Sequence, residues 1–206
     1  MLLRHGRTAW NAIGRAQGHA DVELDDTGHQ QAAAVAPHLA RLRPTALWSS
    51  DLARARQTAS YIEKETGLVA ILDPRLREYD VGERTGMTMT EFRDQFSDQY
   101  AAWGEGRFEA VPGAETRAAV EARIVAACHE LLAAVSPGES AVAVTHGAAL
   151  KVAVIALLGW DARHDRALRG IDNCAVAVLQ EEADATSMRL VAYNAAPDFA
   201  SLTADG

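Results

Sequence analysis

Two His-Gly pairs, at His5 and His146, are the most chemically suggestive feature of this 206-residue sequence. Each pair follows a short apolar run that predicts a β-strand, and Arg4 and Arg7 flank the first histidine. A neutral imidazole is a good nucleophile, and fixed guanidinium groups neutralise phosphate oxygens. The pattern therefore predicts chemistry on a phosphate dianion.

An α/β sheet would bring the two histidines together. In such sheets the ligand site lies beyond the carboxyl ends of the strands, so both imidazoles enter one crevice if their strands are neighbours. Backbone N–H groups at the start of the helix after His146 would add an anion-binding site. Arg54 lies in the first turn of a predicted helix, where a cation opposes the helix dipole unless an anion is bound there. We expect Arg4, Arg7 and Arg54 to converge on a phosphate and to lower the pKa of His5.

Hydrolysis of a phosphate ester also needs a proton donor for the leaving oxygen. Glu78 is the best candidate, because it follows the predicted strand 68–72 and lies at the mouth of the expected site. Asp80, Glu83 and Glu115 are alternatives that spacing alone does not exclude. The sequence has no metal-ligand motif and no phosphate-binding glycine loop, so we expect neither a metal nor a cofactor.

Strand-like and helix-like segments alternate along most of the chain. The predicted strands are 1–3, 45–48, 68–72, 140–144, 173–180 and 188–193, the last two forming a hairpin. The first predicted helix is 27–42, with a capping box at 27–30. The second is capped by residues 49–51 and ends at 66. The remaining predicted helices are 90–100, 116–134 and 148–158. This order predicts a single domain over 1–206. The expected fold is a three-layer α/β/α sandwich with a mostly parallel central sheet, an antiparallel edge strand and a loop-rich insertion at 84–114 over the active site.

Composition excludes several classes of protein. A net charge of −8 with no basic cluster argues against a nucleic-acid partner. No segment is apolar enough for a membrane span, and none resembles a signal peptide. Cys128 and Cys174 are interpreted as reduced thiols of a cytoplasmic protein. The expected partner is a small phosphorylated substrate, and a homodimer is left open.

The motifs resemble those of the histidine phosphatase superfamily, in its phosphoglycerate mutase-like branch. Arg4-His5-Gly6-Arg7-Thr8 with Asn11 is similar to the family's RHGxTxxN signature. The resemblance continues in order through Gln17-Gly18, Leu24, Thr27-Gly28, residues 49–55, Thr58-Ala59, Leu76, Glu78, Gly82, Gly86, residues 112–115, Thr145-His146-Gly147 and Asn173-Cys174. It therefore covers nearly the whole chain.

This resemblance implies a transient phosphohistidine on His5. The same resemblance implies that Arg4, Arg54 and His146 hold the phosphoryl oxygens, and that Glu78 donates the proton and later activates water. It also implies a group of substrate-binding residues, made up of Arg7, Asn11, Gln17, Gly18 and Gly147.

The acceptor of the phosphoryl group distinguishes a phosphatase from a phosphoglycerate mutase. Mutases that resemble this chain are longer and carry a basic insertion that holds a second phosphate. The corresponding stretch 84–114 contains three arginines and five carboxylates, namely Arg84, Arg93, Arg107, Glu91, Asp94, Asp98, Glu105 and Glu109. Water is the favoured acceptor, with the mutase as the alternative and an inactive phospho-ligand binding module as a remote one.

The substrate is less well specified. Residues 16–24 and 190–195 resemble those of glucosyl-3-phosphoglycerate phosphatases, while α-ribazole phosphatases and broad-specificity sugar-phosphate phosphatases are alternatives. Phe92, Trp103 and Phe108 either set the choice of substrate or form the small core of the insertion.

Overall fold

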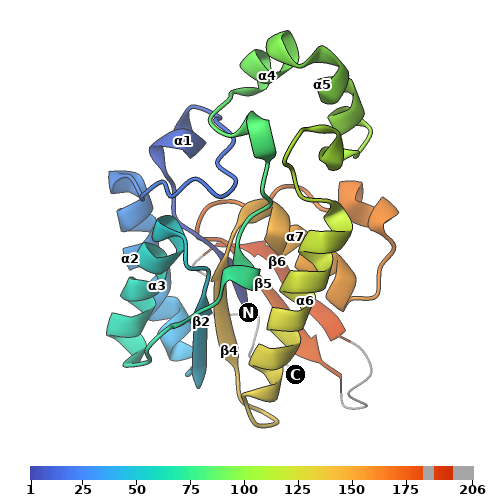
Figure 1. The fold of residues 1–206 in the computed structure, drawn as a ribbon. Helices are drawn as coiled ribbons and strands as arrows, with labels where there is room; N and C mark the ends of the chain where they lie inside the picture. The colour runs from blue at the N-terminus through green and yellow to red at the C-terminus, as the bar shows by residue number, and fades with distance from the viewer. Residues whose placement is uncertain (183–187, 197–206) are drawn as a thin grey trace.

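The computed structural model describes residues 1–182 and 188–196, which are built around a six-stranded sheet (Figure 1). Its strands are β1 (Leu2–Arg4), β2 (Ala46–Ser49), β3 (Ile71–Leu72), β4 (Ala141–Thr145), β5 (Val176–Glu181) and β6 (Met188–Ala195). Their order across the sheet is β3-β2-β4-β1-β5-β6. The first four in this order pair in parallel, whereas β5 pairs antiparallel with both β1 and β6. The predicted closing hairpin is confirmed.

Helices cover both faces of this sheet. Figure 1 shows α2 (Asp26–Arg41) and α3 (Ala53–Thr66) on one face, and α6 (Arg117–Ala133) and α7 (Gly147–Leu157) on the other. Alternate strand residues enter the two cores, since side chains point to opposite faces along a strand. Leu3 and Val144 belong to one core cluster, and Leu2 and Ala143 to the other. The predicted three-layer sandwich is therefore confirmed.

The insertion at 84–114, called the cap below, lies beyond the carboxyl edge of the sheet (Figure 1). It contains two short helices, α4 (Met89–Gln95) and α5 (Ser97–Gly104), where a single helix over 90–100 was predicted. The chain breaks at Phe96, whose backbone leaves the helical conformation. Phe92 is fully buried there against Phe96, Tyr100 and Trp103. Packing around Phe92 thus accounts for two helices at an angle instead of one.

Two helix starts differ from the prediction because their caps come from other residues. Helix α2 begins at Asp26, with the Asp25 carboxylate accepting the Gly28 N–H at 2.8 Å, so the capping box predicted at 27–30 is wrong. Helix α3 has no side-chain cap from its own N-cap residue, Leu52. Instead, Asp21 of a distant loop accepts the Ala53 N–H at 2.5 Å.

Three further segments complete the path of the chain near the site. They are α1 (Ala9–Ala12) and two 3-10 helices, Pro74–Leu76 and Gly82–Arg84. The predicted strand 68–72 is reduced to the two residues of β3. Among the described residues, no helix is both long and apolar enough to cross a bilayer.

Candidate active site

The two histidines lie next to each other at the carboxyl ends of neighbouring strands. Arg4 of β1 is paired with Thr145 of β4, and the His5 N–H donates to the Thr145 carbonyl at 3.0 Å. The ring centroids of His5 and His146 are 5.1 Å apart, and both side chains are buried. The parallel pairing of β1 with β4 therefore brings the two imidazoles together.

One hydrogen bond defines the tautomer of His5. Its Nδ1 lies 2.7 Å from the Gly6 carbonyl oxygen. A carbonyl only accepts hydrogen bonds, so Nδ1 carries the proton and the lone pair is on Nε2. Burial, together with the positive charges of Arg54 and Arg4, holds the pKa of His5 well below its ordinary value. His5 is thus neutral at pH 7, with Nε2 free to act as a nucleophile.

Two arginines form the cationic part of the site. Arg54 is fully buried and donates to the carbonyls of Gly18 at 2.8 Å and Ala20 at 2.7 Å. Burial lowers the pKa of Arg54 to about 10, which still leaves it charged at pH 7. Arg4 donates to the Ile171 carbonyl at 2.5 Å, while its buried Nε has no protein partner among the described residues. Both guanidinium groups face the cavity described below.

Gly147 leaves room for Arg4. A Cβ atom at position 147 would lie 3.2 Å from Arg4 Nε and 3.4 Å from the guanidinium carbon, closer than most such contacts. The glycine after His146 therefore lets the guanidinium pass close over the start of α7. Gly147 itself is not among the residues that line the cavity, although it was predicted to contact substrate.

His146 lies behind Arg54. Its Nδ1 accepts from Arg54 Nε at 3.2 Å, so the ring proton is on Nε2, which donates to Ser50 Oγ at 2.8 Å. Burial and the charge of Arg54 hold the pKa of His146 well below its ordinary value. The neutral ring thus has one N–H donor, on Nε2, and its hydrogen-bond acceptor is Ser50. The sequence did not identify Ser50 as a residue of the site.

The Glu78 carboxylate lies at the N-terminus of α7. Its Oε2 accepts the Ala148 N–H at 3.0 Å, and its Oε1 accepts the N–H groups of Ala149 at 2.9 Å and Tyr79 at 3.0 Å. Helix α7 lacks a side-chain cap from His146, its own N-cap residue. Glu78 therefore caps this helix from a distance. Of the predicted alternatives, Asp80 also lines the cavity, whereas Glu83 and Glu115 do not.

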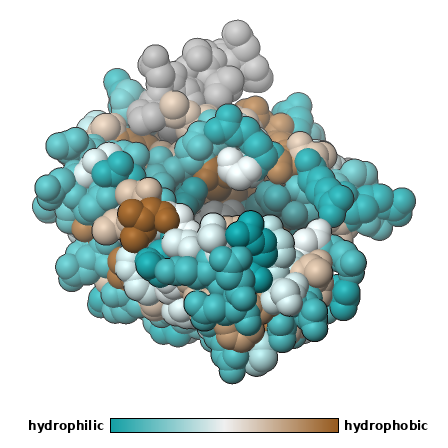
Figure 2. Space-filling model, turned by 90° about the horizontal axis from the view of Figure 1, so that it is seen from above, coloured by the Kyte–Doolittle hydropathy of each residue, from teal (hydrophilic) through white to brown (hydrophobic). Residues whose placement is uncertain are grey.

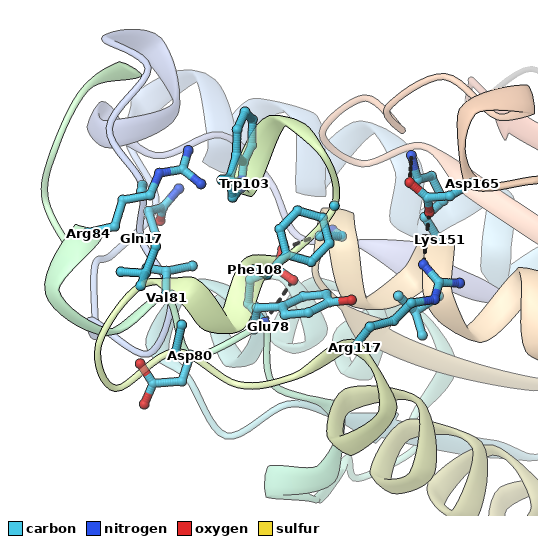
Figure 3. Close-up of a pocket in the computed structure, with 18 of the residues that line it drawn as sticks. Gln17, Glu78, Asp80, Val81, Arg84, Trp103, Phe108, Arg117, Lys151 and Asp165 are labelled. Atoms are coloured by element: carbon cyan, nitrogen blue, oxygen red, sulfur yellow. Dashed lines mark hydrogen bonds and ion pairs between the residues drawn. The ribbon is translucent and has the colours of Figure 1, made fainter. Parts of the chain in front are cut away.

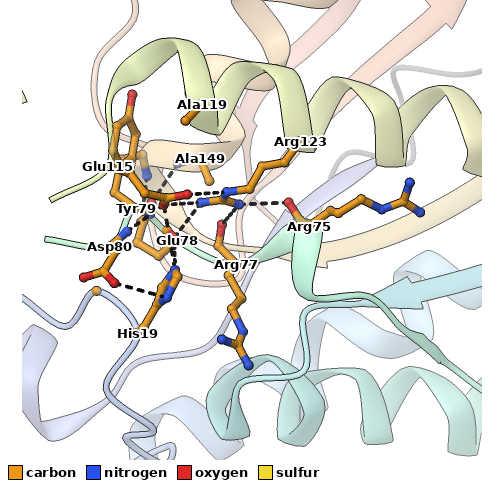
Figure 4. A network of polar contacts seen from close by, with 12 residues as sticks. His19, Arg75, Arg77, Glu78, Tyr79, Asp80, Glu115, Ala119, Arg123 and Ala149 are labelled. Atoms are coloured by element: carbon orange, nitrogen blue, oxygen red, sulfur yellow. Dashed lines mark hydrogen bonds and ion pairs between the residues drawn. The ribbon is translucent and has the colours of Figure 1, made fainter. Parts of the chain in front are cut away.

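Arg123 of α6 clamps the segment that carries Glu78 (Figure 4). It donates to the backbone carbonyls of Arg75 at 2.8 Å, Arg77 at 2.7 Å and Glu78 at 2.8 Å. It also donates to both carboxylate oxygens of Glu115, at 2.9 and 2.8 Å. The sequence did not identify this residue. Three of its partners are backbone carbonyls, which every residue type has, so no motif indicates the contact. Glu115 is thus part of the support of Glu78 and not a rival to it.

These groups open into a cavity of about 530 Å³ between the sheet edge and the cap (Figure 3). In Figure 2 the same side of the molecule shows a hollow with apolar walls among hydrophilic residues. Such a volume is typical of a small-molecule site. The predicted residues that line it are Arg4, His5, Asn11, Gln17, Gly18, Arg54 and Glu78. His146 is fully buried and does not line it. The cavity is thus much larger than a phosphate needs.

Arg7 is not among the residues that line this cavity, and its predicted role in substrate binding stays a prediction. Its guanidinium pairs with Asp25 at 2.9 Å and donates to Thr27 at 2.7 Å. Arg7 therefore joins the RHG segment to the start of α2, where Gly28 also lies against the Arg7 backbone.

The cap aromatics divide between the two roles that the sequence left open. Phe92 is fully buried and forms the centre of the cap's own core. Trp103 and Phe108 line the cavity, and their ring centroids are 6.2 Å apart. The cap therefore contributes apolar surface to the site as well as packing of its own.

Known proteins are similar to this chain in sequence and in fold. The model of the histidine phosphatase superfamily (branch 1) matches residues 1–194. A glucosyl-3-phosphoglycerate phosphatase of Mycobacterium tuberculosis is 36% identical over 182 residues, which cover 85% of this chain and 82% of that protein. A probable phosphoglycerate mutase of Cronobacter sakazakii is 37% identical over 180 residues, covering 85% and 81%.

Solved structures agree with these matches. The structure of a mycobacterial glucosyl-3-phosphoglycerate phosphatase in complex with VO3 has a TM-score of 0.87 and 34% identity, covering 95% of this chain and 98% of that one. The match of the family model over residues 1–194 and the similarity of the fold confirm the predicted family and, with it, the phosphatase class. The chain belongs to the histidine phosphatase superfamily, branch 1.

Proposed function

We propose that this protein hydrolyses a small phosphomonoester through a phosphohistidine on His5. The observation that carries the proposal is the free Nε2 of a neutral, buried imidazole in a cavity shared with two arginines and a carboxyl group. Such a cavity combines a nucleophile, charge neutralisation and a proton donor, which are the requirements for phosphoryl transfer.

The first step transfers the phosphoryl group to His5. The Nε2 lone pair forms an N–P bond while the ester P–O bond breaks, and the carboxyl proton of Glu78 moves to the leaving oxygen. In the second step the Glu78 carboxylate takes a proton from water, and the water oxygen forms a P–O bond while the N–P bond breaks. Inorganic phosphate leaves, and both residues return to their starting states.

Arg4, Arg54 and His146 are the proposed donors to the phosphoryl oxygens. Arg4 Nε is buried without a protein partner among the described residues, so it is available to an oxyanion. Arg54 is held by two carbonyls and one histidine, which fixes its position before substrate arrives. Preorganised donors of this kind stabilise the transition state because they need no rearrangement during the reaction.

Water is the proposed acceptor, with a glycerate hydroxyl as the alternative. Of the three cap arginines only Arg84 lines the cavity. Arg93 pairs with Asp94 at 3.0 Å and Arg107 with Glu105 at 2.5 Å, both on exposed surface. A single cap cation is a poor site for the second phosphate of a bisphosphate, which supports hydrolysis. The similarity to a probable phosphoglycerate mutase keeps the alternative open to test.

The test is phosphate release from a panel that includes glucosyl-3-phosphoglycerate, because similar phosphatases carry that name. Release is expected to persist in EDTA, to be inhibited by vanadate and to be lost in His5→Ala. Activity in His5→Ala or its loss in EDTA would refute the mechanism. Conversion of 3-phosphoglycerate that depends on 2,3-bisphosphoglycerate and releases no phosphate would establish the mutase instead.

A further inference from the structure

The cavity contains more positive charge than one phosphate requires, in a chain of net charge −8. Beyond the two arginines assigned to the phosphoryl group, five cationic side chains line it: Arg15, Arg84, Arg117, Lys151 and Arg166. Four of them have an evident reason to be there. Arg15 pairs with the Glu91 carboxylate at 2.8 Å, and Lys151 and Arg117 pair with Asp165 at 3.0 and 3.2 Å. Arg166 is exposed to solvent.

Arg84 is different, because it is partly buried and has no counter-ion. Within 1–182 and 188–196 its guanidinium takes part in no ion pair and no hydrogen bond, and its Nε is shielded from water. Its guanidinium carbon lies 4.7 Å from the ring centroid of Trp103 and 5.1 Å from that of Phe92. Figure 3 shows it on the same side of the cavity as Gln17 and Trp103. The two rings therefore hold the guanidinium group of Arg84, which has no counter-ion among the described residues, at the cavity wall.

This arrangement is unfavourable unless an anion is bound. Burial lowers the pKa of Arg84 because desolvation penalises its charged form. Stacking on aromatic rings offsets only part of that penalty. An anionic ligand group would offset the remainder and satisfy the shielded N–H. Gln17 Oε1 is also buried without a partner in the described structure, so a polar ligand atom would fit beside it.

We propose that Arg84 binds a carboxylate carried by the substrate, so that the preferred substrates are phosphomonoesters of carboxylic acids. This proposal rests on the proposed function and deepens it. A carboxylate fits better than a second phosphate, because one guanidinium balances one negative charge and pairs with a carboxylate in bidentate geometry. A phosphate dianion would call for a second partly buried cation without a counter-ion. Arg15 is already paired with Glu91. Arg117 has buried N–H groups without a hydrogen bond, but Asp165 balances its charge as it does that of Lys151, and Arg166 is exposed to solvent.

The test uses pairs of ligands that differ in a carboxylate. They are 3-phosphoglycerate against glycerol 3-phosphate, and phosphoserine against phosphoethanolamine. Dissociation constants are measured by calorimetry in a His5→Ala background, where no turnover occurs, and kcat/KM is measured with intact His5. Arg84→Met removes the charge but keeps an unbranched apolar side chain against Trp103. Arg84→Lys keeps the charge but cannot form the bidentate hydrogen bonds of a guanidinium group. Arg93→Met is the matched control, since Arg93 belongs to the same cap and is exposed.

We expect Arg84→Met to reduce the preference for the carboxylate member of each pair by about 10- to 100-fold, the range for a hydrogen bond to a charged group. Arg84→Lys should give a smaller loss, and Arg93→Met should leave the preference unchanged. Equal weakening of both members, or the same loss in Arg93→Met, would overturn the proposal. If the binding preference follows Arg84 but no phosphate is released with His5 intact, the carboxylate site stands and the proposed hydrolysis fails.

Discussion

Arg123→Met provides a strong test of how Glu78 is positioned. The variant removes all five hydrogen bonds of the guanidinium, three to the carbonyls of residues 75, 77 and 78 and two to Glu115. Methionine keeps the apolar stem but cannot donate. The segment that carries Glu78 then loses its three hydrogen bonds to Arg123 of α6, while no atom of Glu78 itself is changed.

The loss of stability can be estimated from these bonds. A hydrogen bond to a charged group contributes about 1.5–3 kcal/mol, and the group left behind must be resolvated. The side chains of Arg123 and Glu115 are 17% and 23% exposed, so water replaces part of what is lost. We expect the free energy of unfolding to fall by about 3 kcal/mol, as for a broken buried ion pair. For a chain of this size Tm would fall by about 6–12 °C.

The effect on catalysis should depend on the leaving group. General acid catalysis contributes about 10²- to 10⁴-fold, and a misplacement of about 1 Å costs about 10²-fold. We expect kcat for an alkyl phosphate to fall about 100-fold in Arg123→Met. p-Nitrophenyl phosphate has a leaving group that needs little protonation, so its kcat should fall about tenfold or less. Steady-state phosphate release with both substrates, well below the Tm of the variant, measures the difference.

Two further variants make this test decisive. Arg75→Met removes two ion pairs from the same segment, one with Asp73 and one with Glu130, and leaves the Arg123 contacts in place. It should therefore change stability without changing the ratio of the two rates. In a Glu78→Gln background, Arg123→Met should have little further effect on kcat, because the two residues act as one unit. Equal losses of kcat for both substrates in Arg123→Met would refute the positioning role.

Two other predictions concern the histidine pair. Gly147→Ala places a Cβ 3.2 Å from Arg4 Nε and should lower kcat/KM about tenfold with little change in Tm, since the guanidinium must shift. The depressed pKa values of His5 and His146 keep both neutral in the folded state, whereas the unfolded chain protonates them below about pH 6.5. The free energy of unfolding should therefore fall as pH decreases below 6.5, and urea denaturation of His5→Ala should show a slope shallower by about 1.4 kcal/mol per pH unit. Parallel slopes for the two proteins would contradict the assignment.

The parts of the site that were predictable from sequence share one property. His5 and His146 directly follow apolar strands, so parallel pairing alone is enough to place them side by side. Arg54 was identifiable because a cation in the first turn of a helix is locally unfavourable. For the histidines the signal is their position directly after a recognisable strand. For Arg54 the signal is a positive charge where the helix dipole disfavours it.

Arg7, Arg84 and Arg123 show where such reasoning stops. All three are arginines near motifs, yet one pairs with Asp25, one stacks on aromatic rings and one holds backbone carbonyls. The partner decides the role. Asp25, Trp103 and the Arg77 carbonyl each lie 18 or more residues from the arginine that they contact, in a fold that local patterns do not specify. Arg7 was expected beside the phosphate because it flanks His5 in sequence, and its pairing with Asp25 is not visible from that position.

Helix starts point to a more general relation between capping and function. Helix α3 carries Arg54, and helix α7 follows His146. Neither helix receives a side-chain cap from its own N-cap residue. Asp21 and Glu78 supply the missing acceptors from distant loops. The Asp21 loop also provides the two carbonyls that hold Arg54, so one loop both caps α3 and positions a residue of the site. In this chain, a helix start that lies at the candidate site and lacks a local cap therefore marks the place where a carboxylate from a distant segment reaches the site.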